Sequence, residues 1–81
     1  MKINVRLFSI YRDIVGVGEM TIEAAEKTTN IDILETLLHE YPRLRLYEKT
    51  LVIAVNREIV DLGMKLRDGD EVAIMPPVGG G

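Results

Sequence analysis

The sequence contains no cysteine, no tryptophan and a single histidine, and these absences exclude several kinds of site. Without cysteine there is no disulfide framework, no thiol nucleophile and no cysteine-ligated zinc. A serine–histidine–aspartate arrangement would have to use His39, which lies near the end of a predicted helix, where the helix dipole favours a partial positive charge. A chain of 81 residues accommodates one small domain. Its stability must therefore come from packed aliphatic side chains.

Long apolar runs and an excess of positive charge are also missing. The longest uninterrupted apolar run, Leu51 to Val55, is far shorter than the ~20 residues of a membrane-spanning helix. Thirteen acidic residues against ten basic ones give a net charge of −3, which gives no reason to expect a nucleic-acid partner. The first residues, Met-Lys-Ile-Asn-Val-Arg, place charges where the apolar region of a signal peptide would lie. We therefore expect a cytoplasmic protein with no membrane and no nucleic-acid partner.

The glycines do not form a nucleotide-binding motif. Gly16 and Gly18 are followed by Thr21 at the position where a dinucleotide-binding turn has its third glycine, and no G-x-x-x-x-G-K-[ST] run is present. The sequence therefore predicts that any ATP used with this protein is bound by a partner. We expect the chain to bind no cofactor and no metal of its own.

Alternating apolar residues predict two strands near the start of the chain. Residues 2–8 alternate with period two, and Phe8 falls on the same face as the polar side chains. Residues 20–25 alternate in the same way, so we expect the two strands to pair as a hairpin. Between them, residues 10–15 are expected to form a short helical turn or a loop. The buried face of the first strand is predicted to carry Ile3, Val5 and Leu7.

The clearest helix is predicted to begin after Thr29. Asp32 follows three residues later, which makes a variant of the capping box in which aspartate replaces the usual glutamate or glutamine. Pro42 is expected to end the helix, because the residue before a proline disfavours helical dihedrals. Apolar residues recur with the helical period and predict one buried stripe. The stripe consists of Ile31, Leu34, Leu37, Leu38 and Tyr41.

The second half of the chain predicts three more strands. They are separated by turn-forming residues, and together with the first half they give an α+β fold in which one helix packs across one face of a sheet. We expect one domain over residues 1–75 and a separate tail over residues 76–81. The expected strands are residues 51–55, 59–60 and 71–75, and the expected turns are Asn56-Arg57-Glu58 and Asp68-Gly69-Asp70.

The tail, Pro76-Pro77-Val78-Gly79-Gly80-Gly81, does not have the composition of a structural element. Two prolines cannot donate hydrogen bonds to a sheet, so the sheet is expected to end at Met75. The glycines bury nothing and have no Cβ, which suits a flexible tip that enters a narrow site in another protein. The only special chemical group at this tip is the α-carboxylate of Gly81. The alternative interpretation is a frayed terminus or the start of a linker.

Strand alternation also predicts an exposed apolar patch beside the base of the tail. If the helix covers the aliphatic face of the first strand, Phe8 projects from the opposite face, and Ala73 and Met75 of the last strand project outward beside it. Exposed apolar patches often mark sites at which partners bind. Alternatively, Phe8 and Met75 tuck under a loop, or a bulge reverses their direction.

Several short segments occur together, in a fixed order, along nearly the whole chain. They are Leu7-Phe8-Ser9, Arg12-Asp13 with Gly16, Ala54-Val55-Asn56, Leu66 with Asp68-Gly69-Asp70-Glu71-Val72-Ala73, and Pro76-Pro77-Val78 with Gly80-Gly81. In this combination and spacing the sequence resembles the MoaD/ThiS-type ubiquitin-like sulfur carriers, and most closely the MoaD branch, the small subunits of molybdopterin synthase. One departure is Gly79, where the family commonly carries serine or threonine.

The resemblance implies a β-grasp fold, which is a mixed sheet with one main helix across one face. It also implies that a MoeB-like, ubiquitin-activating-type enzyme uses ATP to adenylate the Gly81 carboxylate, and that a sulfur donor then replaces AMP to give a thiocarboxylate. A MoaE-like large subunit of molybdopterin synthase would receive the tail, and the sulfur would pass to the pterin precursor to form its dithiolene. The chain would thus supply a reactive group and not catalytic side chains. The residues expected to contact these partners are Gly80, Gly79, Val78, Pro77 and Pro76, with Phe8, Met75 and Ala73 from the sheet.

Three other functions are compatible with the same sequence. The tail suits a protein modifier that is joined to lysines of target proteins, as in some archaeal relatives, because that chemistry begins with the same adenylate. It also suits a sulfur carrier for another acceptor, such as thiazole or transfer RNA. A plain interaction module is the last alternative, and it predicts that deleting Gly80 and Gly81 changes nothing.

Overall fold

The computed structural model describes residues 1–77, and its first element is the strand β1 (Lys2–Leu7). Its aliphatic side chains are buried on one face, and each burial of this kind stabilises the fold by about 1.5–3 kcal/mol. The strand β2 (Glu19–Glu23) pairs with β1 in an antiparallel hairpin, so the prediction for the first half of the chain is confirmed. The buried side chains of β1 are Ile3, Val5 and Leu7.

A short helix, α1 (Ser9–Val15), connects these two strands. It ends where Gly16 adopts a φ of +95°, a left-handed conformation that side chains with a Cβ rarely adopt. The Gly16 N–H donates to the Arg12 carbonyl over 2.8 Å and closes the last turn. The sequence predicted a helical turn or a loop at this position, and the structure contains two turns of helix.

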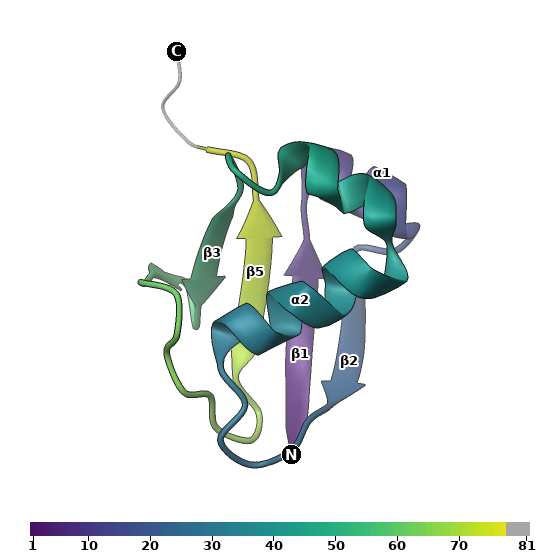
Figure 1. Ribbon diagram of the computed structural model, residues 1–81. Coiled ribbons are helices and arrows are strands. Elements are labelled where there is room, and N and C mark those ends of the chain that lie inside the picture. The colour runs from purple at the N-terminus through teal and green to yellow at the C-terminus, as the bar shows by residue number, and fades with distance from the viewer. Residues whose placement is uncertain (78–81) are drawn as a thin grey trace.

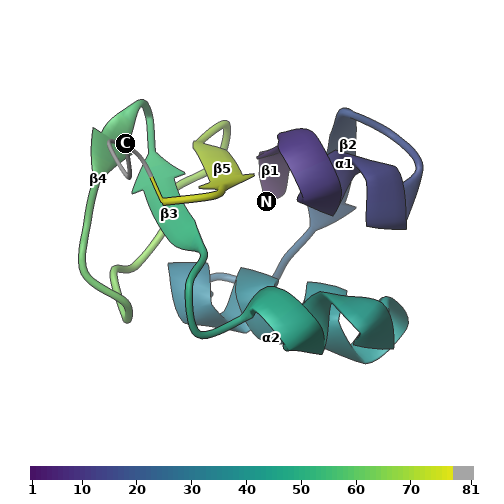
Figure 2. The same ribbon diagram turned by 90° about the horizontal axis from the view of Figure 1, so that it is seen from above.

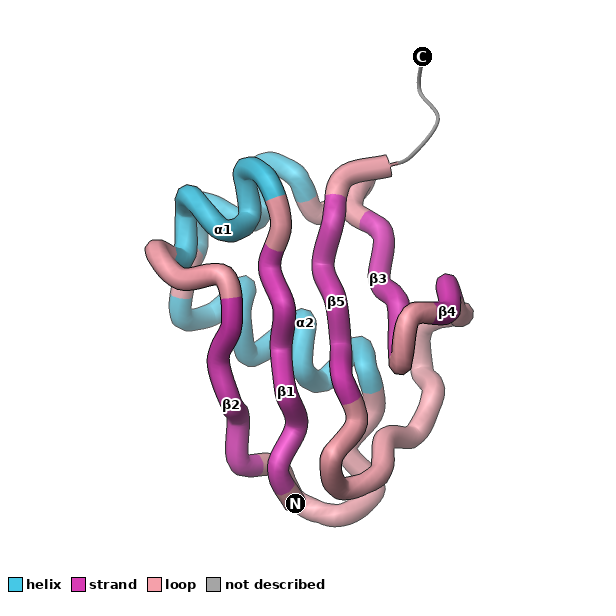
Figure 3. Tube along the Cα trace, turned by 180° about the vertical axis from the view of Figure 1, so that it is seen from behind, coloured by secondary structure: helices cyan, strands magenta, loops and turns pink. Residues whose placement is uncertain are grey.

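The sheet is completed by three strands from the second half of the chain, β3 (Val52–Val55), β4 (Glu58–Ile59) and β5 (Glu71–Met75). The strand order is β2-β1-β5-β3-β4 (Figures 1 and 3). β1 and β5 run parallel, whereas every other neighbouring pair is antiparallel. The first and last strands therefore lie side by side at the centre of a mixed sheet, as in a β-grasp fold.

The main helix, α2 (Asn30–Glu40), covers one face of the sheet, and Figure 2 shows the two layers from above. It begins with the predicted capping box. The Asp32 N–H donates to the Thr29 Oγ1 over 3.3 Å, and the Thr29 N–H donates to the Asp32 Oδ2 over 2.9 Å. Two backbone donors at the start of the helix are thereby satisfied.

The buried stripe of α2 differs from the predicted stripe at its first turn. Ile33 is buried against the sheet, whereas Ile31 is only half-buried at the border of the stripe. The prediction for Ile31 was wrong because burial of Asn30 rotates the stripe toward Ile33, which lies one turn further along the same side of the helix. The other buried residues of the stripe are Leu34, Leu37 and Leu38, with Tyr41 half-buried at the end.

Pro42 ends α2 as predicted and opens a 3₁₀ helix, η1 (Pro42–Tyr47), which closes one end of the core. Leu44 is buried there, and the Tyr47 ring packs edge-to-face on Tyr11 of α1 with ring centroids 6.2 Å apart. Burial raises the pKa of the Tyr11 hydroxyl above its ordinary value. None of the helices in residues 1–77 is long and apolar enough to cross a membrane.

The β3–β4 hairpin is one residue tighter than predicted. Asn56 and Arg57 both have positive φ, 50° and 70°, which is the backbone of a two-residue hairpin turn. β4 therefore comprises Glu58 and Ile59, and the expected strand at residues 59–60 was displaced by one position. The signal in the sequence was Asn56, a residue that tolerates left-handed backbone well.

The turn before β5 forms from Asp68-Gly69-Asp70 as predicted. Gly69 has a φ of +85°, and both carboxylates accept hydrogen bonds from the backbone. The Arg67 N–H donates to the Asp70 Oδ2 over 2.8 Å, and the Lys2 N–H donates to the Asp68 Oδ1 over 2.6 Å. The turn thus joins the start of β1 to the start of β5.

Asn30 is the one buried polar side chain in the core of the described residues, and it ties the start of α2 to the loop before β5. Its Nδ2 donates to the Asp61 carbonyl over 2.9 Å, and its Oδ1 accepts from the N–H groups of Gly63 at 2.7 Å and Met64 at 3.1 Å. Such a buried amide is favourable only while its hydrogen bonds are made. Asn30 therefore holds this long loop against the helix.

We predict that Asn30→Ala lowers the free energy of unfolding by about 2–3 kcal/mol, because it leaves buried backbone groups of the loop without partners. The measurement is urea unfolding followed by circular dichroism. Thr36→Ala is the matched control in the same helix, since it removes only the exposed hydrogen bond from Thr36 Oγ1 to the Asp32 carbonyl. The control should change stability by no more than about 0.5 kcal/mol. Equal losses in the two variants would contradict this role for Asn30.

Candidate functional site: the open face of the sheet

One face of the sheet carries no helix, and Figure 3 views the molecule from that side. We call it the open face. Alternation along β1 places Asn4 and Arg6 on it, and the parallel register with β5 places Glu71 and Ala73 beside them. The side chains of this face are available to a partner because they do not contribute to the core beneath α2.

An apolar row crosses the open face at the end where β5 leaves the sheet. The Phe8 N–H donates to the Ile74 carbonyl over 3.1 Å and thereby continues the parallel register of β1 and β5 past Leu7, which places Phe8 beside Met75. Met75 pairs in turn with Val52 of β3. We call Phe8, Met75 and Val52 the apolar row. Phe8 is 36% exposed and the other two are half-buried, so Phe8 and Met75 point outward as predicted.

Ala73 lies on the open face, but it is only 5% exposed, and the expectation that it contributes exposed apolar surface was wrong. Its register partners are Arg6 on one side and Ala54 on the other. The methyl group is short, and the longer Arg6 side chain stands beside it. Ala73 is thus part of the floor of this face, and a role for it in partner binding stays a prediction.

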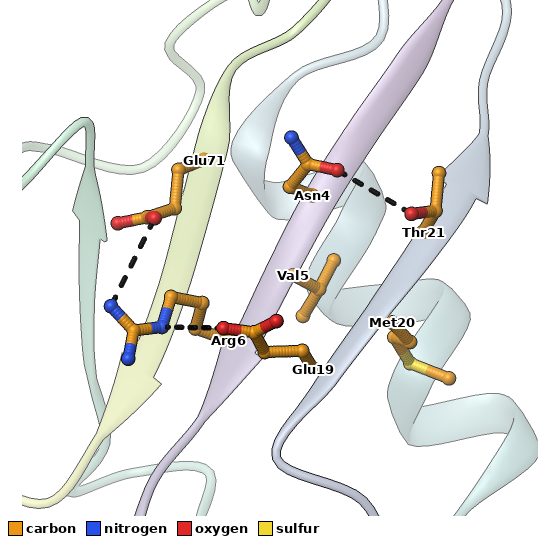
Figure 4. A pocket seen from close by; sticks show the side chains of 7 residues that line it. All are labelled: Asn4, Val5, Arg6, Glu19, Met20, Thr21 and Glu71. Atoms are coloured by element: carbon orange, nitrogen blue, oxygen red, sulfur yellow. Dashed lines mark hydrogen bonds and ion pairs between the residues drawn. The ribbon is translucent and has the colours of Figure 1, made fainter.

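The part of the open face along β1, β2 and the start of β5 is polar, and Figure 4 shows this part from close by. Arg6 occupies its centre. The Arg6 Nε lies 3.5 Å from the Glu19 Oε1, and the Arg6 Nη1 lies 4.0 Å from the Glu71 Oε2. Glu71 also lies 3.9 Å from the Nε of Arg57. Arg6 and the two glutamates lie in a shallow hollow of the surface. The hollow is lined by Asn4, Val5, Arg6, Glu19, Met20, Thr21 and Glu71.

The Arg6 guanidinium also approaches the apolar row. Its Cζ lies 5.2 Å from the centroid of the Phe8 ring, a cation–π distance. Sequence reasoning missed Arg6 and Val52 as site residues. Arg6 had a signal in the sequence, because it lies two residues before Phe8 and so shares its face. Val52 had none, because its position beside Met75 depends on a strand pairing that one sequence does not reveal.

The base of the tail lies next to the apolar row. β5 ends at Met75 as predicted, Pro76 is half-buried and Pro77 is exposed. Val78, Gly79, Gly80 and Gly81 lie outside the described residues. The predicted reactive carboxylate and the predicted partner contacts of the tail therefore stay predictions.

The described part of the chain contains no group of three or more histidine, aspartate or glutamate side chains that could hold a metal ion. His39 lies exposed in the last turn of α2, away from any such partner set. The charged side chains that lie close together on the open face are arginines and glutamates in ion pairs, and such groups suit recognition of a partner.

The ThiS family matches residues 5–81, which is nearly the whole chain and includes the last glycine. A molybdopterin synthase sulfur carrier subunit from Chlamydomonas reinhardtii is 41% identical over 83 aligned positions that span all of both chains. The crystal structure of SAMP1, a small archaeal modifier protein from Haloferax volcanii, matches with a TM-score of 0.85, 25% identity and complete coverage of both chains. These likenesses agree with the β-grasp topology of the sheet.

A third likeness is to a protein in a complex. The structure of the complex of subunits 1 and 2 of the molybdopterin-converting factor from Helicobacter pylori contains a chain that matches with a TM-score of 0.69 and 29% identity, with complete coverage of both chains. In that structure a protein of this fold is thus bound to a second kind of subunit.

We predict that Phe8→Ala lowers the free energy of unfolding by about 1 kcal/mol or less, because Phe8 belongs to the open face. Leu7→Ala is the matched comparison, since Leu7 is the adjacent residue but points into the core, and its truncation should cost about 2–5 kcal/mol. Urea unfolding of the two variants measures both values. A loss for Phe8→Ala as large as that for Leu7→Ala would show that Phe8 belongs to the core and not to the open face.

Proposed function

The chain belongs to the ThiS family, and on this premise we propose that it is a sulfur carrier that serves as the small subunit of a molybdopterin synthase. The observation that carries the proposal is the likeness, over the full length of both chains, to a relative named for that role. The family match also extends to Gly81, the residue whose carboxylate would carry the sulfur.

The proposed chemistry takes place at the end of the chain. A carboxylate is a poor acyl donor because its leaving group would be oxide. Attack of the Gly81 carboxylate on the α-phosphate of ATP gives an acyl-adenylate and releases pyrophosphate. A sulfur nucleophile then displaces AMP, and the product is a thiocarboxylate on the same carbonyl carbon. Transfer of this sulfur to a pterin precursor, with water supplying the replacing oxygen, regenerates the carboxylate.

The position of the base of the tail, Pro76 and Pro77, supports a role in which another protein performs the catalysis. β5 brings the chain to the end of the open face at which the apolar row lies, and Pro76 and Pro77 stiffen the chain where it leaves the sheet. Four further residues span at most about 14 Å when extended. A partner that covers the apolar row would therefore receive the carboxylate within that distance of its own surface. The partner would supply the groups that orient and catalyse the reaction.

The large subunit of the synthase is the partner with the most support, since the similar Helicobacter pylori protein complex joins subunits 1 and 2 of the molybdopterin-converting factor. An ATP-dependent adenylating enzyme and a sulfur donor follow from the chemistry, because the glycines of this chain form no nucleotide-binding motif. We place all three partners, with this chain, in the cytoplasm.

A protein modifier is the second candidate, and the likeness to the Haloferax volcanii modifier favours it. Both functions begin with the same adenylate and diverge only at the acceptor. A modifier transfers its carbonyl carbon to the amino group of a lysine and forms an isopeptide bond, whereas a sulfur carrier gives up sulfur and keeps its own carboxyl carbon. The fate of Gly81 therefore separates them.

We predict that the purified protein, incubated with the adenylating enzyme of its host, ATP and a sulfur source, gains the mass of AMP or the mass of an oxygen-to-sulfur exchange. Intact-mass spectrometry measures the change. A variant that lacks Gly81 should fold equally well and gain no mass, because its terminal carboxylate is one residue short of the enzyme's reacting centre.

The large subunit provides the second half of the test. Adding it with a pterin precursor should return the carrier to its original mass. An isopeptide bond between Gly81 and a lysine, with no sulfur transfer, would favour the modifier. No mass change with an adenylating enzyme that activates another carrier would refute both functions.

A further inference from the structure

The Arg6 side chain makes fewer hydrogen bonds than its partial burial would favour. The Nε atom is buried, yet it donates no hydrogen bond to any group in the described part of the chain. Its nearest charged neighbour, the Glu19 Oε1, is 3.5 Å away, and the Glu71 Oε2 is 4.0 Å from the Nη1. A charge-assisted hydrogen bond of this kind is normally about 2.7–2.9 Å long. The guanidinium is thus partly desolvated without full compensation (Figure 4).

Neither Glu19 nor Glu71 is placed to complete the hydrogen bonds of the Arg6 guanidinium. Glu19 belongs to the edge strand β2 and its side chain is 75% exposed, so water competes with Arg6 for its oxygens. Glu71 lies between two arginines, because the Nε of Arg57 is 3.9 Å from its Oε1. The pairs are loose, and exposed pairs at such distances contribute little to stability. The Arg6 guanidinium can therefore donate further hydrogen bonds to an acceptor on another molecule.

Arg6 also lies where a partner must cover it. Its guanidinium is 5.2 Å from the Phe8 ring, and Phe8 is the exposed member of the apolar row. A surface that buries the Phe8 ring removes water from the guanidinium at the same time. A desolvated charge without a counter-charge is strongly unfavourable. The covering surface must therefore bring an acceptor, and an ionised one compensates best because a guanidinium binds a carboxylate through two parallel hydrogen bonds.

We propose that Arg6 is a specificity-determining residue of the open face, and that the protein covering the apolar row presents an aspartate or glutamate carboxylate to its guanidinium. The inference rests on the proposed function for the identity of that protein, which is the large subunit. The partner carboxylate replaces Glu19, whose exposed side chain turns to solvent. The local charge then stays balanced, with two arginines facing Glu71 and the partner carboxylate.

The test compares dissociation constants for the purified large subunit of the same host, measured by isothermal titration calorimetry at low and high salt. Arg6→Met keeps an unbranched stem over Ala73 but removes the charge, and it should weaken binding about 10- to 100-fold and flatten the salt dependence. Arg6→Lys keeps the charge without the planar fork, so it should weaken binding less than Arg6→Met. It also serves if Arg6→Met folds poorly.

Two further variants make the result specific. Arg57→Met is the matched control, since Arg57 pairs with the same Glu71 but its side chain is 82% exposed and the cation–π contact to Phe8 comes from Arg6, so it should weaken binding much less than Arg6→Met does. Phe8→Ala tests whether the large subunit binds the apolar row, and it should weaken binding. If Phe8→Ala weakens binding and Arg6→Met does not, the proposed role of Arg6 is wrong, although the open face remains the binding surface.

The remaining outcomes are equally decisive. Equal losses for Arg6→Met and Arg57→Met would indicate general electrostatic attraction, and the proposal would be wrong. If neither Phe8→Ala nor Arg6→Met weakens a measurable complex, the large subunit binds a different surface. The proposal for Arg6 would then be wrong, and so would the assignment of the open face as the binding surface. If the wild-type chain does not bind the large subunit at all, the proposed function fails together with the assignment to Arg6.

Discussion

The parallel pairing of β1 with β5 is the constraint on which the rest of the structure depends. It places the first and last strands side by side at the centre of the sheet, so that the end of the chain leaves from the middle of the fold and not from an edge. The same register sets Phe8 beside Met75 and Arg6 beside Ala73. The core, the open face and the base of the tail are therefore all fixed by one strand pair. Parallel neighbours require a long connection, and here α2 and the β3–β4 hairpin lie within it.

The alternation of β1 places its side chains in two different environments. Every second side chain of β1 enters the core beneath α2 and contributes to stability. The side chains between them face outward and do not contribute to the core. A substitution on the open face can therefore change recognition with little effect on folding, which is why Leu7 and Phe8, adjacent in the chain, are expected to respond so differently to truncation. In a protein of this size the arrangement matters, because few residues can be withdrawn from the core.

Local signals predicted local structure. Thr29 and Asp32 predicted the start of α2, Asp68-Gly69-Asp70 predicted the turn before β5, and Pro42 predicted the end of α2. The predictions were wrong at residues whose burial depends on segments that are distant in the sequence. Asn30 is buried because the loop around Gly63 wraps over it, and Ala73 is covered because Arg6 stands beside it in the register. Arg6 itself was missed because nothing in the sequence indicates that its Nε is buried without a partner. Long-range pairing, not local propensity, settles such environments.

An 81-residue chain without cysteine can serve as the proposed sulfur carrier because its reactive group belongs to the backbone. The terminal carboxylate requires no side chain, no metal and no pocket in the carrier, so the side chains of the open face can be devoted to choosing partners. Two kinds of contact suit that task. The apolar row gives affinity through burial but discriminates weakly between apolar surfaces, whereas a partly buried arginine penalises any surface that lacks an acceptor. The combination allows a carrier to bind its partners well enough for transfer and to reject proteins that merely present an apolar patch.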